Sequence, residues 1–179
     1  MLRIRLLGGF AAETNGQPVP VPAWRLRRAK TLVKLLALAP ERRLHREQIV
    51  ELLWPSGGGT PAGLHQVLYT ARRALGGEQV TLQEDVVALS GDSLWLDVDA
   101  FERAAASARD ARDPAAYREA LELYTGELLP EDRYEDWAEA RRESVRELHL
   151  ALLVELAALQ DDGTAIETLQ RAVVEDPLH

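Results

Sequence analysis

The sequence of 179 residues contains no cysteine, and this absence excludes several kinds of chemistry. Without thiols the chain has no disulfide framework, no thiolate nucleophile and no zinc site that requires cysteine. The histidines are His45, His65, His149 and His179. They lack the spacing of a metal site, and no nucleophile stands beside a base in a recognised motif. We therefore expect neither an enzyme nor a protein that holds a metal or another cofactor.

Long apolar runs are also missing. No segment approaches the roughly 20 apolar residues that span a bilayer, so we expect no membrane partner. The apolar stretch in MLRIRLLGGFAAE is short, contains Gly8 and Gly9 and meets Glu13, which favours a β-strand over a signal peptide. The loop SGGGT lacks the Gly-Lys-Ser/Thr ending of a phosphate-binding loop, so we expect no nucleotide site there.

Acidic residues are scarce in one half of the chain and abundant in the other. The net charge is −8, but residues 1–80 contain 12 Lys and Arg against 5 Asp and Glu. Residues 81–179 contain 9 Lys and Arg against 24 Asp and Glu. Such asymmetry indicates that the basic half contacts nucleic acid or a membrane. The alternative is that a helical second half simply carries solvated, Glu-rich faces.

The first half of the chain combines short strands with helices. Residues 1–20 alternate around Asn15-Gly16, a strong hairpin signal, and predict two or three short strands. Apolar residues at helical spacing predict helices over about 24–39, 44–54 and 62–75. A hairpin is expected around Glu84-Asp85, with or without a further strand after it.

From Asp99 onward the apolar period is helical throughout. The predicted helix starts are Asp99 with Glu102, Asp113 with Pro114, and Thr164 with Glu167. A long periodic stretch covers about residues 136–159, and Pro177 is expected to end the last helix. Tyr134 and Trp137 are expected to fill the helical core.

The order of these elements indicates the fold class. A winged helix-turn-helix has three helices followed by a β-hairpin, which is the order predicted here. In that fold the third helix enters the major groove of DNA. The change of period places a domain boundary near residues 91–99. The sequence therefore predicts an α+β winged helix-turn-helix domain at residues 1–98 and an all-α domain at residues 99–179.

The third predicted helix has an apolar stripe and a polar face that carries no acid. The stripe comprises Leu64, Val67, Leu68, Ala71 and Leu75. The residues that we expect to face bases are His65, Gln66, Tyr69 and Thr70. Gln can donate to and accept from adenine, and Thr can offer a methyl group to thymine, whereas Arg72 and Arg73 suit phosphates. The alternative is an ordinary solvated helix face.

Two further basic clusters lie at the starts of the first two predicted helices. They comprise Arg25, Arg27, Arg28 and Lys30 in the first and Arg43, His45 and Arg46 in the second. Helix N-termini attract phosphates, so we expect these residues to contact the DNA backbone. The alternative is ordinary surface charge. We also expect at least one of Arg27 and Arg28 to face inward or to pair with an acid. Trp54 is expected to pack in the core or to anchor a loop.

These segments resemble the SARP family of antibiotic-regulatory bacterial transcriptional activators, which have an OmpR-type winged helix. The resemblance of the first half rests on LLGGF, LRRAKTLVKLLAL, REQIVELLWP and LHQVLYTARRALG. The second half resembles the family's bacterial transcriptional activation domain, a tetratricopeptide-like helical array, through LDVDAFE, LYTGELLP, YEDWAE and IETLQRAVVEDPLH. The match covers nearly the whole chain. It implies a cytoplasmic activator that binds double-stranded DNA and uses its helical domain for self-association or for contact with RNA polymerase.

Two features depart from the family pattern. The hairpin tip carries Glu84 and Asp85, where a winged helix usually offers Arg, Lys or Gly to a phosphate. The chain ends at EDPLH, where the family's next helix pair begins, so we expect it to be part of a longer regulator. The alternative function is a protein-interaction module whose winged helix no longer binds DNA, which the acidic hairpin tip and the net charge favour.

Overall fold

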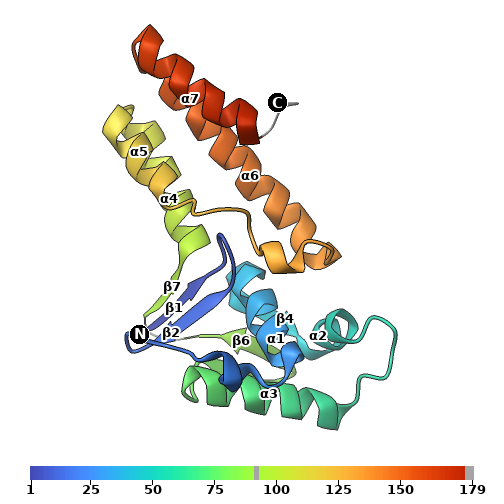
Figure 1. The fold of residues 1–179 in the computed structure, drawn as a ribbon. Helices are drawn as coiled ribbons and strands as arrows, with labels where there is room; N and C mark the ends of the chain where they lie inside the picture. Colours follow the sequence, from blue (N-terminus) through green and yellow to red (C-terminus); the bar gives the residue numbers. More distant parts are fainter. Residues whose placement is uncertain (91–92, 176–179) are drawn as a thin grey trace. The chain divides into compact units, whose positions relative to one another are not determined.

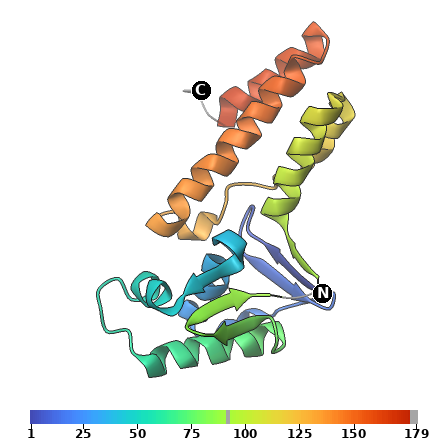
Figure 2. The ribbon, with the colours of Figure 1, turned by 180° about the vertical axis from the view of Figure 1, so that it is seen from behind.

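The computed structural model describes residues 1–90 and 93–175 and combines small sheets with many helices (Figures 1 and 2). Its contacts divide the chain into two units. The N-terminal unit comprises Met1–Leu6 and Phe10–Leu96, and the helical unit comprises Leu7–Gly9 and Asp97–His179. The predicted α+β character of the first half and helical character of the second are confirmed. That residues 1–98 fold by themselves remains a prediction.

Short strands form the first sheet of the N-terminal unit. The sheet has the order β3-β2-β1-β7, from strands β1 (Leu2–Arg5), β2 (Ala11–Thr14), β3 (Gln17–Pro18) and β7 (Leu94–Leu96). Leu2 and Ile4 of β1 are buried and the residues that follow them are exposed, as the alternation predicts. Asn15 and Gly16 have positive φ values of 53° and 77° and form the predicted hairpin turn.

Helices complete the core of the N-terminal unit. They are α1 (Arg27–Leu38), α2 (Arg46–Leu53) and α3 (Pro61–Leu75), with the short 3₁₀ helices η1 (Val21–Trp24) and η2 (Pro40–Arg42). The buried residues of α3 are the five of the predicted stripe, so the predicted rotation of this helix is confirmed. Thr60 caps α3 by accepting a hydrogen bond from the Gly63 amide at 3.0 Å. Gly76 ends it with a left-handed φ of 91°.

A second sheet has the order β4-β6-β5. It consists of β4 (Arg43–His45), β5 (Val80–Gln83) and β6 (Val86–Leu89). The predicted hairpin turns at Glu84 and Asp85, which both have positive φ. The predicted start of the second helix is wrong, because residues 43–45 pair with β6 and α2 begins only at Arg46.

The helical unit is built from helices that each pack on the next (Figure 1). They are α4 (Asp97–Ala111), α5 (Pro114–Glu122), α6 (Asp136–Ala157) and α7 (Asp162–Glu175), with a 3₁₀ helix, η3 (Pro130–Asp132), before α6. Phe101, Leu152 and Leu153 are completely buried between them. The long predicted stretch at 136–159 is therefore a helix, although it ends two residues earlier.

The predicted cap at Asp99 is wrong. Helix α4 begins at Asp97, so Asp99 lies within its first turn. The Asp97 side chain is only 4% exposed and its carboxylate accepts hydrogen bonds from the amides of Leu7 at 2.9 Å and Val98 at 2.8 Å. A contact with a residue 90 positions away thus decides where the helix starts, and local spacing could not reveal it.

The other two predicted helix starts have different outcomes. Asp113 is the N-cap residue of α5 and Pro114 its first helical residue, as predicted. The predicted cap at Thr164 is wrong, because the Asp161 carboxylate accepts the Thr164 amide at 3.1 Å and Thr164 lies inside α7. The predicted stop at Pro177 lies outside the described residues.

Tyr134 does not fill the helical core as predicted. Its side chain is 93% exposed, because it lies in the turn between η3 and α6 and not on a helix face. Trp137 is half-buried and its indole N–H donates to Glu135 at 3.2 Å. The aromatic core instead includes Tyr124 and the buried His149, whose rings stack at 3.9 Å between centroids.

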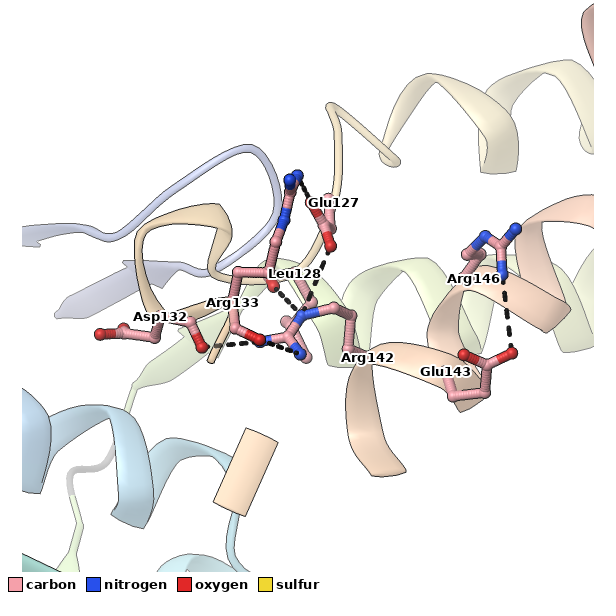
Figure 3. A network of polar contacts seen from close by, with 7 residues as sticks. All are labelled: Glu127, Leu128, Asp132, Arg133, Arg142, Glu143 and Arg146. Carbon is pink, nitrogen blue, oxygen red and sulfur yellow. Dashed lines mark hydrogen bonds and ion pairs between the residues drawn. The ribbon is translucent and has the colours of Figure 1, made fainter. Parts of the chain in front are cut away.

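Arg142 of α6 holds the segment that precedes this helix (Figure 3). Its guanidinium donates to the carbonyl oxygens of Leu128 at 3.1 Å, Asp132 at 2.9 Å and Arg133 at 3.4 Å. It also pairs with the carboxylate of Glu127 at 3.6 Å, and its side chain is only 11% exposed. One arginine therefore satisfies carbonyl groups of three residues in an irregular segment.

Candidate nucleic-acid interface

Helix α3 presents a polar ridge opposite its buried stripe. The ridge consists of Gln66, Tyr69 and Arg73, which lie at positions i, i+3 and i+7 and are all exposed. Tyr69 is 59% exposed, which is unusual for a large aromatic side chain. With a guanidinium, an amide and a phenol, the ridge offers hydrogen-bond donors and no carboxylate.

A groove of about 530 Å³ runs between this ridge and the segment around η1. The residues of α3 that line the groove are Gln66, Tyr69, Thr70 and Arg73. Pro20, Pro22 and Arg25 contribute to the opposite wall. We call this the α3 groove. The sequence did not suggest this wall, because η1 lies some 40 residues before α3 and is brought to it only by the fold.

Thr70 and His65 differ from the other two predicted base-facing residues. The Thr70 hydroxyl donates to the Gln66 carbonyl at 2.8 Å, so the side chain has its methyl group left for an apolar contact. His65 lines a separate cavity of about 370 Å³ with residues of α2, including Arg46 and Val50. The structure therefore brings Gln66, Tyr69 and Thr70 together in the α3 groove, whereas His65 lines a different cavity.

The basic residues at the start of α1 point in different directions. Arg25 lines the α3 groove, whereas Arg27 and Lys30 line another groove of the same unit. The Arg28 Nε donates to the Leu53 carbonyl at 3.0 Å, and its guanidinium lies 5.0 Å from the centre of the Trp54 ring. Arg28 therefore interacts with a backbone carbonyl and an aromatic ring, and not with an acidic side chain.

Trp54 anchors a loop, which confirms one of the two predicted roles. It follows α2, and a Cβ at Gly63 would come within 3.3 Å of its ring. Gly59 is more crowded still, since a Cβ there would lie 2.5 Å from Val50. Gly59 of the loop and Gly63 of α3 therefore allow the backbone to pack directly on Trp54.

The basic residues at the start of α2 are engaged within the unit. Arg43 forms an ion pair with Glu41, and Arg46 pairs with Asp85 of the hairpin tip at 2.8 Å. His45 caps α2, and its Nδ1 accepts the Glu47 amide at 3.4 Å. Arg46 therefore offsets one of the two acidic charges at the hairpin tip.

Arg72 and Arg73 are neighbours in sequence with different surroundings. The Arg72 Nε donates to the Val80 carbonyl at 2.8 Å and so connects α3 to the first strand of the hairpin. Arg73 is exposed on the ridge. Sequence spacing alone could not separate them, because the partner of Arg72 is a backbone carbonyl, which leaves no signature in the sequence.

The clearest electrostatic cluster of the helical unit is structural. Arg109 donates to both carboxylate oxygens of Glu155, at 2.8 and 2.9 Å, and the Tyr117 hydroxyl donates to the same carboxylate at 3.0 Å. The Arg109 hydrogen bonds lower the pKa of Glu155 despite its partial burial. Burial, reinforced by the hydrogen bond to Glu155, raises the pKa of Tyr117. These side chains connect α4, α5 and α6.

Neither a metal site nor a membrane span was found in the part of the chain that the structure describes. Within residues 1–90 and 93–175, no three His, Asp or Glu side chains are placed to hold a metal ion. Over the same residues, none of the helices has the length and the apolar character to cross a bilayer.

Comparison with known proteins gives a family match for the second half of the chain. Residues 96–179 match the family profile of the bacterial transcriptional activator domain. Among solved structures, the chain is similar to Mycobacterium tuberculosis EmbR in complex with a low-affinity phosphopeptide, with a TM-score of 0.75 and 22% identity. The similarity covers 98% of this chain and 51% of that chain, so this chain spans about half the length of the protein that it matches. A search of curated proteins gave no match.

Proposed function

We propose that the chain is a SARP-type bacterial transcriptional activator that binds specific duplex DNA. The match of residues 96–179 to the bacterial transcriptional activator domain supports this proposal. In this proposal residues 1–98 are a winged helix-turn-helix domain and α3 enters the major groove. The observation that carries the proposal is the ridge of α3, which exposes Gln66, Tyr69 and Arg73 on a helix without acids. A carboxylate at this position would meet phosphates on both sides of the groove.

In this proposal the residues of the α3 groove have different roles. Gln66 reads a base edge through its amide, Thr70 contacts a thymine methyl, and Tyr69 packs between them. Arg73 and Arg25 lie at the groove as well and bind phosphates or a guanine edge. Because Arg28, Arg43, Arg46 and Arg72 have partners within the protein, we propose that they contribute to DNA binding mainly through their charge.

The helical unit has a separate role in this proposal. Residues 99–179 form a tetratricopeptide-like array that mediates self-association or contact with RNA polymerase. The excess of acidic residues over basic ones in this half supports a protein partner, because DNA would be repelled by it.

The second candidate function is a protein-interaction module that has lost DNA binding. The acidic hairpin tip favours it, because Asp85 pairs with Arg46 and leaves less positive charge for a phosphate at that end of the sheet. Selection of bound sequences from random duplex DNA separates the two functions. Enrichment of one motif supports the transcription factor, whereas no enrichment at low salt favours the interaction module.

The selected site then allows a salt titration that tests the electrostatic part. If about four to six phosphates are bound, the logarithm of affinity should fall with the logarithm of salt at a slope of about −4 to −5. Arg73→Ala should reduce this slope by about one. Arg118→Ala is the matched control, because Arg118 is exposed on α5 of the acidic unit and should leave the slope unchanged. A flat salt response in the unmodified chain would contradict DNA binding.

A further inference from the structure

Two arginines of the α3 groove have no partner among the described residues. Arg25 and Arg73 line the groove and are exposed, and neither forms an ion pair or a side-chain hydrogen bond within residues 1–90 and 93–175. They differ in this respect from Arg28 and Arg72 of the same unit, which donate to backbone carbonyls. The charge of Arg25 and Arg73 can therefore pair with the acids of a ligand.

The same groove has apolar walls. Pro20, Pro22 and Leu26 line it, and the Tyr69 ring lines it from α3. Proline rings and an aromatic ring are surfaces on which another aromatic side chain packs well. The volume of about 530 Å³ is within the range of sites that bury a ligand. The groove therefore suits a ligand that combines an aromatic ring with negative charge.

The segment before α6 combines these two properties. Tyr134 is 93% exposed, and residues 130–139 contain five Asp and Glu against one Arg. Asp136 and Glu139 lie at positions i and i+3 of α6 and are exposed. Neither carboxylate has an ion pair or a hydrogen bond among the described residues. We call Tyr134, Asp136 and Glu139 the Tyr134 turn.

Hydrogen bonds hold the backbone beside Tyr134 in place. The Glu135 amide donates to the Asp132 carbonyl at 3.0 Å. Arg142 donates to the same carbonyl and to that of Arg133 (Figure 3). A side chain on a backbone that is already fixed loses less conformational freedom on binding, and tyrosine is enriched among the residues that contribute most to protein interfaces. The Tyr134 turn therefore has the properties of a docking element.

We propose that the Tyr134 turn of one copy of the chain docks into the α3 groove of a second copy. The Tyr134 ring packs on Pro20 and Pro22, and the two acids of the turn pair with Arg25 and Arg73. Each copy carries both surfaces, so it can engage two neighbours.

Charge complementarity favours a second copy as the occupant of the groove. Residues 1–80 contain 12 Lys and Arg against 5 Asp and Glu, whereas residues 81–179 contain 9 against 24. The helical half of one copy therefore attracts the N-terminal half of another, and the pairing of opposite charges orients the two surfaces.

The consequence for regulation rests on the proposed function. In that function the α3 groove holds DNA through Gln66, Thr70 and Arg73. The Tyr134 turn would occupy the same groove, so this self-association and DNA binding exclude each other. An excess of the selected duplex should dissociate the assemblies. Tyr134→Ala should raise the apparent DNA affinity at protein concentrations where the unmodified chain self-associates.

Sedimentation velocity of the full chain without DNA, from about 5 to about 500 μM, tests the contact. The mean sedimentation coefficient should rise with concentration. Salt at about 1 M should suppress the rise seen at about 0.1 M, because the Debye length shortens from about 10 to about 3 Å. Tyr134→Ala and Arg73→Glu should each weaken self-association by at least about tenfold. Glu147→Gln, a change at an exposed acid of α6, is the matched control and should leave it unchanged.

A mixture of two variants tests the pairing of the surfaces directly. Arg73→Glu disables the groove and keeps the turn, whereas Tyr134→Ala disables the turn and keeps the groove. Both residues are exposed, so both variants should fold. Each variant alone should be monomeric at a concentration where the unmodified chain self-associates. The equimolar mixture should form a heterodimer and no larger species, because one intact turn and one intact groove remain.

Several results would overturn the proposal. They are a chain that stays monomeric up to about 500 μM, self-association that neither variant weakens, or a mixture of the variants that stays monomeric. Because these measurements contain no DNA, their failure leaves the proposed DNA binding untouched. Conversely, a failed DNA selection leaves the sedimentation results valid.

Discussion

Gln66 and Arg73 share the ridge of α3 but should contribute differently to DNA binding. Gln66→Ala removes an amide that reads a base edge, so it should cost about 1–3 kcal/mol on the selected site and much less on random DNA. Arg73→Ala removes a positive charge that attracts any phosphate and should weaken binding to both. Fluorescence anisotropy with a selected and a scrambled duplex at one salt concentration measures the two effects.

Thermal unfolding provides the control for these variants, because both side chains are exposed and neither should change the melting temperature. If Gln66→Ala leaves both affinity and sequence preference unchanged, Gln66 does not read bases. The reading surface would then have to include the His65 side of α3, which lies against α2.

The Glu155 cluster predicts how stability depends on pH. The folded pKa of Glu155 is below its ordinary value of 4.5, so its contribution is complete above that pH and is lost as pH falls through the folded pKa. The folded pKa of Tyr117 is above its ordinary value of 10.0, so its contribution is complete below that pH and is lost as pH rises through the folded pKa. Stability should therefore decline at both extremes.

Chemical denaturation at a series of pH values tests this expectation. Glu155→Gln should make the acid limb below pH 4.5 less steep, because the group that takes up a proton on unfolding is gone. Glu147→Gln is the matched control, since Glu147 is exposed on the same helix. An acid limb that is equally steep in wild type and Glu155→Gln would show that the Arg109 hydrogen bonds do not stabilise the fold.

Among the elements, α3 depends most clearly on its apolar stripe. Leu68 is 2% exposed within that stripe, so Leu68→Ala should leave a cavity and lower the free energy of unfolding by about 2–5 kcal/mol. Denaturant titration gives the loss. Tyr69→Ala, one residue further but 59% exposed, should cost far less, and equal losses in the two variants would mean that the helix is rotated from this position.

Periodicity predicted the elements well, because burial on one face leaves a regular trace in the sequence. The stripe of α3 and the Asn15-Gly16 turn were found in this way. Helix starts were predicted less well, because α4 is fixed by the contact between Asp97 and the distant Leu7 amide. Tyr134 was misplaced because an apolar body in a helical region suggests burial, whereas it lies in a turn before the helix.

The candidate site shows the same division. The absence of acids on α3 identified its exposed ridge, since that is a property of one element. The opposite wall around Pro20 and Pro22 was not foreseeable, because only tertiary packing brings η1 beside α3. Side chains that donate to backbone carbonyls, such as Arg28 and Arg72, were also beyond prediction, because a carbonyl is present at every residue.

At the scale of the whole molecule, residues 1–98 should fold alone and retain DNA binding. The helices and sheets that bury the stripe of α3 lie within this segment. The buried Leu7 would lose its partners Thr125 and Leu128, so the isolated segment should fold with reduced stability. A cooperative thermal transition and specific binding by residues 1–98 would support this. If residues 1–98 unfold in a broad thermal transition without a folded baseline, the domain boundary does not lie at residue 98.

Two motifs that are 118 residues apart meet in the helical unit. Gly8 of LLGGF donates its amide to the Glu127 carbonyl at 2.9 Å, and the Thr125 hydroxyl donates to the Leu7 carbonyl at 2.9 Å. A Cβ on Gly8 would lie 3.0 Å from the Thr125 carbonyl oxygen, and one on Gly126 would lie 3.1 Å from the Gly8 Cα. Both segments therefore need glycine where their backbones come into contact.

Gly8→Ala should therefore destabilise the chain more than Gly16→Ala. The two glycines have nearly the same φ, 71° and 77°, so both variants should carry the left-handed backbone cost of about 1–2 kcal/mol. A Cβ at Gly16 meets nothing within 4 Å, whereas one at Gly8 meets the Thr125 backbone. Denaturant unfolding of the full chain should show the extra loss for Gly8→Ala. In residues 1–98 alone, which lack Thr125, the two variants should lose similar amounts of unfolding free energy. If the two losses are also equal in the full chain, the contact between the two motifs is not close enough to exclude a side chain.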